Sequence, residues 1–209
     1  MVALIEKRGR KAVALRLNVS DTTSFAAFGE VVKETLKHMW NRDNFDFLVN
    51  NAGFGIHALL TETTEEQFDQ LVNVHFKGVF FLTQALLPLM AGGGRIVNIS
   101  SGLARFSYPG NSVYGAVKGA IEVLTRYMAV ELGPRGIAVN AVAPGAIATD
   151  FGGGVVRDNE AVNQQIASQT ALGRVGQAED IGGVVAALLS EETHWINGQK
   201  IEVSGGVNL

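Results

Sequence analysis

Short apolar runs alternate along the chain with longer segments in which apolar residues recur at the spacing of a helix face. Five of the runs predict strands, and they span Ala12–Val19, Phe45–Asn50, Arg95–Ser100, Ala138–Ala143 and Lys200–Val203. This alternation is typical of β-α-β units, whose parallel strands form a sheet that helices cover on both faces. We therefore expect an α/β fold with a doubly wound parallel sheet, in a single domain over residues 1–209.

Four longer segments predict helices between these strands. One begins at Thr64-Glu-Glu-Gln67, where the threonine and glutamine side chains can each cap a backbone N–H group of the other residue. Another ends at Gly133-Pro134, because proline cannot continue a helix. The predicted helices cover about Thr22–Met39, Thr64–Met90, Ser112–Leu132 and Glu179–Leu189.

The segment from Gly152 to Gly173 interrupts this alternation. It opens with three glycines and continues with a polar stretch of helical spacing. A long insertion after a strand lies at the edge of the sheet where ligands bind in such folds. We expect a substrate lid here, and a disordered surface loop is the alternative.

Composition narrows the class of protein. The absence of cysteine excludes a disulfide framework and a thiolate site, and it fits a cytoplasmic location. A formal charge of -3 predicts no nucleic-acid partner, and no apolar stretch approaches the roughly 20 residues of a membrane span. The histidines show no ligand spacing, so we expect ordinary surface or boundary residues and no metal site, although His57 lies towards the expected substrate side; they are His38, His57, His75 and His194.

Tyr114 and Lys118 are four residues apart on a predicted helix, so their side chains project from one face. A phenol ionises near pH ~10, and its use as an acid or base near neutrality requires a pKa shift of roughly 3 units. One neighbouring cation supplies about 1–3 units, and a second positive charge, such as an oxidised nicotinamide ring, would add to it. The pair alone is much more typical of a surface aromatic residue beside a long lysine.

Polar residues follow three of the predicted strands. Ser101 comes directly after Arg95–Ser100, where a hydroxyl could hold a carbonyl oxygen, although Ser100 competes for this role and both serines could form turns. Asn51-Ala52-Gly53 follows another strand, and its glycine either lets the backbone approach a ligand or forms a plain turn. Pro144–Thr149 ends a third, where backbone groups and a hydroxyl could hold a carboxamide.

Together these segments resemble the motif series of the short-chain dehydrogenase/reductase family. They are Leu48-Val-Asn-Asn-Ala-Gly53, Asn73-Val-His-Phe-Lys-Gly78, Arg95-Ile-Val-Asn-Ile-Ser-Ser101, Tyr114-Gly-Ala-Val-Lys118 and Pro144-Gly-Ala-Ile-Ala-Thr149. They occur in the family's order, and Ser101 stands thirteen residues before Tyr114. The resemblance implies a Rossmann-like fold and hydride transfer between NAD or NADP and a small-molecule carbonyl or alcohol.

The resemblance also implies roles for individual residues. Tyr114 would exchange the proton, Ser101 would position the reacting oxygen, and Lys118 would bind the nicotinamide ribose and lower the pKa of Tyr114. Asn73 would hold a water that links Lys118 to solvent. Further cofactor contacts are expected at Asn18, Val19, Asn51, Ala52, Gly53, Pro144, Gly145, Ile147 and Thr149. The family's pairing of its long central helices and last strand implies a homo-oligomer, with a tetramer as the specific prediction.

The chain departs from the family at its beginning. The family starts with a strand, a glycine-rich turn that seats the pyrophosphate on a helix N-terminus, and a second strand, and residues 1–209 show no such unit. We expect the first β-α-β unit to be absent, which would leave strand Phe45–Asn50 beside a gap about 10 Å wide and weaken dinucleotide binding. Two hypotheses follow: an active NAD(P)-dependent oxidoreductase, or a cofactor-poor, weak or inactive relative that acts through partner binding.

Overall fold

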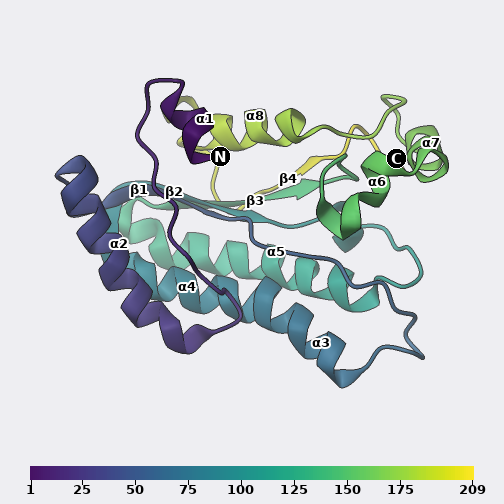
Figure 1. Cartoon of the computed structure of the whole chain (residues 1–209), viewed down its shortest axis with the longest axis horizontal. Coiled ribbons are helices and arrows are strands. Elements are labelled where there is room, and N and C mark those ends of the chain that lie inside the picture. The colour runs from purple at the N-terminus through teal and green to yellow at the C-terminus, as the bar shows by residue number, and fades with distance from the viewer.

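The computed structural model describes all 209 residues and contains one sheet of four parallel strands (Figure 1). The strands are β1 (Phe45–Asn50), β2 (Met90–Ile99), β3 (Ala138–Pro144) and β4 (Lys200–Val203), and they lie side by side in that order. Because all of them run parallel, their carboxyl ends meet at one edge of the sheet. Ligands bind at this edge in open α/β sheets.

Helices cover both faces of the sheet (Figure 1). One face carries α2 (Phe25–Trp40), α4 (Gly78–Leu86) and α5 (Ser112–Leu132), and α3 (Glu65–Val72) leads into α4. The other face carries α8 (Ala178–Leu188) and α1 (Val2–Glu6), while α6 (Val155–Asp158) and α7 (Glu160–Ser168) lie near the carboxyl ends of β3 and β4. The doubly wound α/β fold is confirmed.

The two central strands are apolar on both faces, as expected for strands covered by helices on both sides. Ile96 and Val139 pack towards α5, whereas Val97 and Val142 pack against α8. All four side chains are buried. The centre of the sheet is therefore a rigid base for the loops that follow its strands.

Most predicted elements are confirmed. β1 and β4 have the expected bounds, and β2 begins five residues early because Met90 already pairs with Phe45. The capping box forms, since Thr64 Oγ1 accepts from Gln67 N–H at 3.2 Å and Gln67 Oε1 accepts from Thr64 N–H at 3.0 Å. The predicted lid contains the ordered helices α6 and α7, which contradicts the alternative of a disordered loop.

The predicted strand Ala12–Val19 is wrong. These residues connect α1 to α2 and pair with no strand (Figure 1). Val13 and Leu15 are exposed, whereas Leu17 and Val19 pack against apolar residues of α2 and α4. The apolar alternation is present, but a strand also needs a hydrogen-bonded neighbour, and contacts with helices hold the second half of this segment instead.

Strand β1 forms one edge of the sheet. It pairs with β2 on one side only, and its other side pairs with no strand. On the face that α8 covers further along the sheet, Phe47 and Val49 remain 45% and 37% exposed. An apolar edge of this kind is a surface that tends to pair with further chain.

A widened turn separates α3 from α4. Residues Asn73–Lys77 form a π-helical turn that packs against α5. Such turns are rare and occur frequently at functional sites. This one carries Asn73, an expected site residue, and His75, which the sequence analysis did not single out.

A buried network of side chains fixes the carboxyl end of β1. Asn50 Nδ2 donates to Asn98 Oδ1 of β2 at 2.8 Å and to Thr83 Oγ1 of α4 at 3.1 Å. Asn98 Nδ2 in turn donates to Thr125 Oγ1 of α5 at 3.0 Å. All four side chains are buried, so each bond replaces one that water would otherwise make.

None of the helices is both long and apolar enough to cross a membrane.

Asn98→Ala is expected to lower the free energy of unfolding by roughly 2–4 kcal/mol, because it leaves buried partners unsatisfied and opens a cavity. Equilibrium unfolding in urea measures this change. Asn44→Ala is the matched control, because Asn44 is an exposed residue before β1, and a change within about 0.5 kcal/mol is expected there. Equal losses in the two variants would contradict the role of the network.

Candidate active site

The carboxyl ends of β1, β2 and β3 bring the predicted site residues to one edge of the sheet. Asn51 follows β1, Ser101 follows β2, and Gly145 follows β3. Helix α5 supplies Tyr114 and Lys118 from its first two turns, and both side chains are buried. The structure therefore brings together the serine, tyrosine and lysine that the sequence analysis selected.

Lys118 is held by the end of β2. Its Nζ donates to the backbone carbonyl of Ile99 at 2.7 Å and lies 5.6 Å from the centroid of the Tyr114 ring. The side chain is only 4% exposed, and burial lowers the pKa of Lys118 to about 8. The ammonium form, which predominates at neutral pH, thus lies beside the phenol at a fixed position.

Tyr114 differs from the expectation in the direction of its pKa. Burial raises the pKa of Tyr114 to about 12, and the hydroxyl of Ser101 lowers it by less. The Ser101 hydroxyl therefore lies near the phenol, and its influence on the pKa of Tyr114 is smaller than that of burial. The charge of Lys118 does not offset the effect of burial on the pKa of Tyr114. The four-residue spacing of the two side chains could not show how deeply the tyrosine is buried.

The structure separates the two candidate serines. The hydroxyl of Ser100 points towards α5, 2.9 Å from Glu122 Oε1 and 3.2 Å from the carbonyl oxygen of Lys118. Ser101 Oγ lies on the loop side and accepts from Leu103 N–H at 3.2 Å, which caps the short helical turn after β2. Ser100 is thus a structural residue, and the hydroxyl of Ser101 still has its own proton to donate.

Asn73 begins the π turn, and its backbone carbonyl accepts from Gly78 N–H at the end of that turn. The turn lies against α5, the helix of Lys118. Asn73 therefore lies on an element that packs directly against the helix of Tyr114 and Lys118.

His75 is a site residue that the sequence analysis missed. It is 1% exposed, and its ring meets the Tyr114 ring edge to face with centroids 5.3 Å apart. Burial, with the charge of Lys118 as a smaller cause, lowers the pKa of His75 to about 4, so the ring is neutral at pH 7. The only sequence signal was its position within the Asn73 motif, and spacing alone gave it no role.

Aromatic residues line the loops around Tyr114. Phe151, directly before the lid, has its ring centroid 6.0 Å from that of Tyr114. Phe54 follows β1, and Phe106 and Tyr108 lie in the loop before α5, with rings 5.6 Å apart. The surroundings of the phenol are therefore suited to a flat, apolar compound.

The lid is joined to neighbouring segments by polar contacts. Tyr108 bonds to Gln169 beyond α7 and accepts from Asn208 Nδ2 at 3.2 Å. A separate set of bonds joins the loop before α5 to the C-terminal segment, because Arg105 pairs with Glu202 of β4 at 2.7 Å and donates to the carbonyl of Val207 at the same distance. The lid begins with Gly152, Gly153 and Gly154 at φ of 62°, 73° and 79°, where a side chain would be strained.

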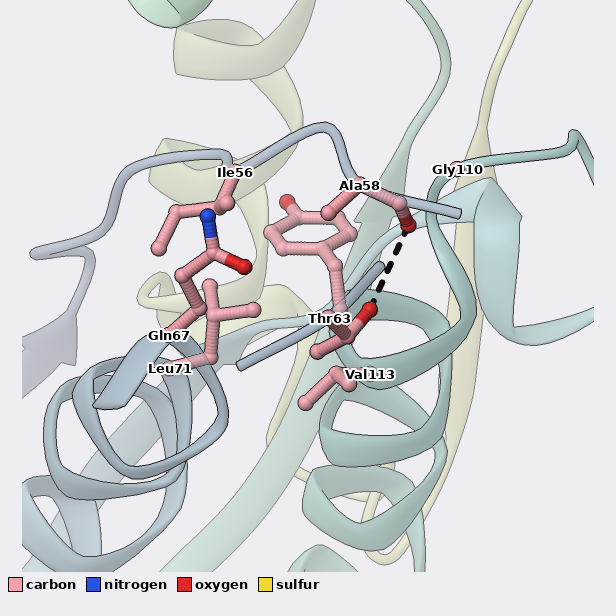
Figure 2. Close-up of a pocket in the computed structure, with 8 residues that line it drawn as sticks. Ile56, Ala58, Thr63, Gln67, Leu71, Gly110 and Val113 are labelled. Carbon is pink, nitrogen blue, oxygen red and sulfur yellow. Dashed lines mark hydrogen bonds between the residues drawn. The ribbon is translucent and has the colours of Figure 1, made fainter. Parts of the chain in front are cut away.

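A small cavity lies beside Tyr114 (Figure 2). Its volume is about 10 Å³, room for roughly one water molecule. Thr63 and Gln67 supply polar groups, and Figure 2 shows the Thr63 hydroxyl donating to the Ala58 carbonyl at 3.5 Å. The loop after β1 thus closes over the start of α3 without filling the space beside the phenol.

The surroundings fit a dinucleotide in two respects. Asn51, Ala52 and Gly53 are exposed at the end of β1, and the backbone N–H of Ile147 donates to no protein acceptor, so it remains free for a carboxamide. Asn18 Oδ1 accepts from the backbone N–H of Ser20 at 3.1 Å, and the backbone carbonyl of Val19 lies against Gly78 of α4. The chain holds no cluster of three or more metal-ligating side chains.

Comparison with known proteins relates this geometry to characterised enzymes. A family model described as enoyl-(acyl carrier protein) reductase matches residues 1–208. An uncharacterized oxidoreductase from Methylorubrum extorquens is 35% identical, over 99% of this chain and 81% of the relative. Tetrahydroxynaphthalene reductase PfmaG from Pestalotiopsis fici is 36% identical, over 99% of this chain and 76% of the relative.

Two solved structures closely match the fold of this chain. The reductase LugOII, which catalyses keto-reduction at C1 during lugdunomycin biosynthesis, has a TM-score of 0.93 and 39% identity, covering 100% of this chain and 82% of the other. The angucycline C-6 ketoreductase LanV, solved with bound NADP, has a TM-score of 0.92 and 36% identity, covering 99% and 79%. These comparisons give no support to the hypothesis of an inactive, partner-binding relative.

The protein is expected to lose stability as the pH falls from 6.5 towards 4, because the pKa of His75 is about 4 in the folded state and 6.5 otherwise. In this range the unfolded chain binds more protons, so acid favours unfolding. The expected loss between pH 7 and pH 4.5 is roughly 2–3 kcal/mol, measured by urea unfolding. His75→Gln should lose less by about that amount; an identical pH dependence would show that His75 titrates normally.

Proposed function

The chain belongs to the short-chain dehydrogenase/reductase family and is an NAD(P)-dependent oxidoreductase, and we propose that it reduces a ketone carried on a fused aromatic ring system. The observation that carries the proposal is the cluster of Ser101, Tyr114 and Lys118 at the carboxyl edge of the sheet. NADPH or NADH, when bound, supplies the hydride to the carbonyl carbon. The residues of the chain bind the ketone, hold its oxygen and deliver the proton.

The chemical states of these side chains favour the reduction direction. Because the pKa of Tyr114 is raised to about 12, its hydroxyl carries a proton at neutral pH and can give it to the oxygen of the ketone as the carbonyl carbon is reduced. Ser101 Oγ donates a hydrogen bond to that oxygen, and Lys118 holds the ribose and stabilises the phenolate that remains. Asn73 holds a water that returns a proton from solvent to Lys118.

The cofactor-binding residues extend this proposal along the edge of the sheet. The exposed residues Asn51, Ala52 and Gly53 meet the adenosine half of the cofactor, with Asn18 and Val19 at the adenine end. Ile147 N–H and the Thr149 hydroxyl hold the carboxamide beside Pro144 and Gly145, where free backbone groups are available.

The substrate class is supported by the similar proteins and by the walls of the site. One relative is a reductase of tetrahydroxynaphthalene, a fused bicyclic aromatic, and the compared structures include ketoreductases. In this chain the ring of Phe151 lies 6.0 Å from that of Tyr114, and the ring of Phe54 contacts His75, which itself packs on Tyr114. A flat ring system can stack on such side chains while its ketone faces the phenol.

A homo-oligomer, with a tetramer as the specific form, is also proposed. Apolar side chains on the outer surface of α5 recur at helical spacing, with Val123, Tyr127 and Val130 being 44%, 64% and 78% exposed. Phe80 and Phe81 of α4 are exposed as well. A two-fold axis between copies would cover this apolar stripe with itself. A cytoplasmic location remains a prediction.

Tyr114→Phe is expected to lower kcat for NADPH-dependent ketone reduction by at least about 100-fold, because only the transferable proton is removed. A tetralone or naphthalenone is the probe, with NADPH varied to millimolar concentration. Cofactor binding and thermal stability should change little. Tyr127→Phe is the matched control on the outer surface of α5. More than a few per cent residual activity, or no reduction by the unaltered protein, would contradict the assignment.

Val130→Asp is expected to dissociate the oligomer, because it places charge within the apolar stripe of α5. Light scattering at micromolar concentration measures the mass of both proteins. Val155→Asp is the control, because Val155 is an exposed apolar residue on α6, away from the stripe. A monomeric mass for the unaltered protein would overturn the proposed oligomer.

A further inference from the structure

His75 occupies a position where three separate segments meet. It lies on the π turn between α3 and α4, is 1% exposed, and contacts both the ring of Tyr114 on α5 and the ring of Phe54 after β1. None of the roles assigned above to Ser101, Tyr114, Lys118 and Asn73 uses this side chain. It is nevertheless the most completely buried titratable group in the site.

The hydrogen bond of His75 defines its tautomer. Nε2 lies 2.8 Å from the carbonyl oxygen of Phe54, and a carbonyl can only accept, so Nε2 carries the proton. The contact of Phe54 N–H with the same nitrogen is longer, at 3.4 Å, and would need the opposite tautomer, so the shorter bond decides. Nδ1 is then an unprotonated, buried atom without a partner.

The backbone of the loop after β1 is shaped around this ring. A Cβ atom at Gly53 would lie 2.7 Å from His75 Cε1, so a larger residue would displace the ring. Gly53 has no left-handed backbone conformation, so the close approach of the ring, and not the backbone angle, requires glycine here. The ring thus contacts the Gly53–Phe54 backbone on one side and the phenol of Tyr114 on the other.

We propose that His75 is a positioning residue for ketone reduction: through the bond from Nε2–H to the Phe54 carbonyl it fixes the loop Asn51–Ile56 against the ring of Tyr114. The proposal rests on the proposed function, because the loop carries the expected cofactor contacts and Tyr114 the expected proton. His75 acts by holding these two groups in register, and it does not touch the reacting atoms.

Replacing His75 by glutamine or by asparagine distinguishes the effect of this hydrogen bond from the effect of burying a polar side chain at the same position. The amide nitrogen of His75→Gln can reach the position of Nε2 and donate to the Phe54 carbonyl, whereas the shorter amide of His75→Asn stands near the position of Nδ1 and cannot. We expect kcat within about threefold of the original in His75→Gln and at least about tenfold lower in His75→Asn. Equal kcat values in the two variants would overturn the proposal.

Hydrogen exchange provides a readout that is independent of catalysis. The amides of Asn51–Ile56 should exchange faster in His75→Asn than in the original protein, and His75→Gln should restore the original rates. Equal exchange in all three proteins would overturn the proposal. If the unaltered protein reduces no ketone, the proposed function fails, and the exchange comparison still decides whether His75 fixes the loop.

Gly53→Ala tests the same contact from the other side and covers the case in which a His75 variant does not fold. The added methyl displaces the His75 ring while all of its hydrogen-bonding groups are retained. Faster exchange of Asn51–Ile56 is expected, together with a lower kcat. Gly119→Ala on α5 is the control, because a Cβ there meets no atom within 4 Å. Unchanged exchange in Gly53→Ala would overturn the proposal.

Discussion

The hydrogen bond between the side-chain amides of Asn50 and Asn98 is the constraint on which the active site depends. Parallel strands leave their loops at one edge of the sheet, but the loops become a site only if the strand ends are held in register with the helices below. The two asparagines provide that register, because they join β1 to β2 and, through threonine hydroxyls, to α4 and α5. One buried network therefore positions Asn51, which follows Asn50 in the chain, and Tyr114, which lies on the same helix as Thr125.

Burial then sets the chemistry of the site. It keeps Tyr114 protonated, brings the pKa of Lys118 towards neutrality and keeps His75 uncharged. These three effects have one cause, since each charged form loses its water when the loops close around the end of the sheet. The protein therefore presents a proton donor beside a single cation, an arrangement in which a developing negative charge on oxygen is favoured over a second positive charge.

The sequence pattern correctly predicted those features of the fold that depend on residues close together in the chain. The strands, the helices and the capping box at Thr64 follow from side-chain periodicity and from hydrogen bonds within a few residues. Ala12–Val19 could not be assigned correctly, because strand formation depends on a neighbour far along the chain. The choice of Ser101 over Ser100 depended on Glu122 in α5, and the importance of His75 depended on a π turn and on the close approach of Gly53. The pKa of Tyr114 could not be predicted, because it depends on how deeply the side chain is buried, and residue spacing does not show this.

The three consecutive left-handed glycines before α6 define where the substrate range of this protein can be engineered. Any other residue at Gly152, Gly153 or Gly154 would strain the backbone. Most variants from a random library at these positions would therefore misfold in this segment. Helix α7 has no buried residue and tolerates change on most of its surface. Diversity placed there, with the glycines kept, changes the side chains that α7 exposes while the backbone path of the segment stays the same.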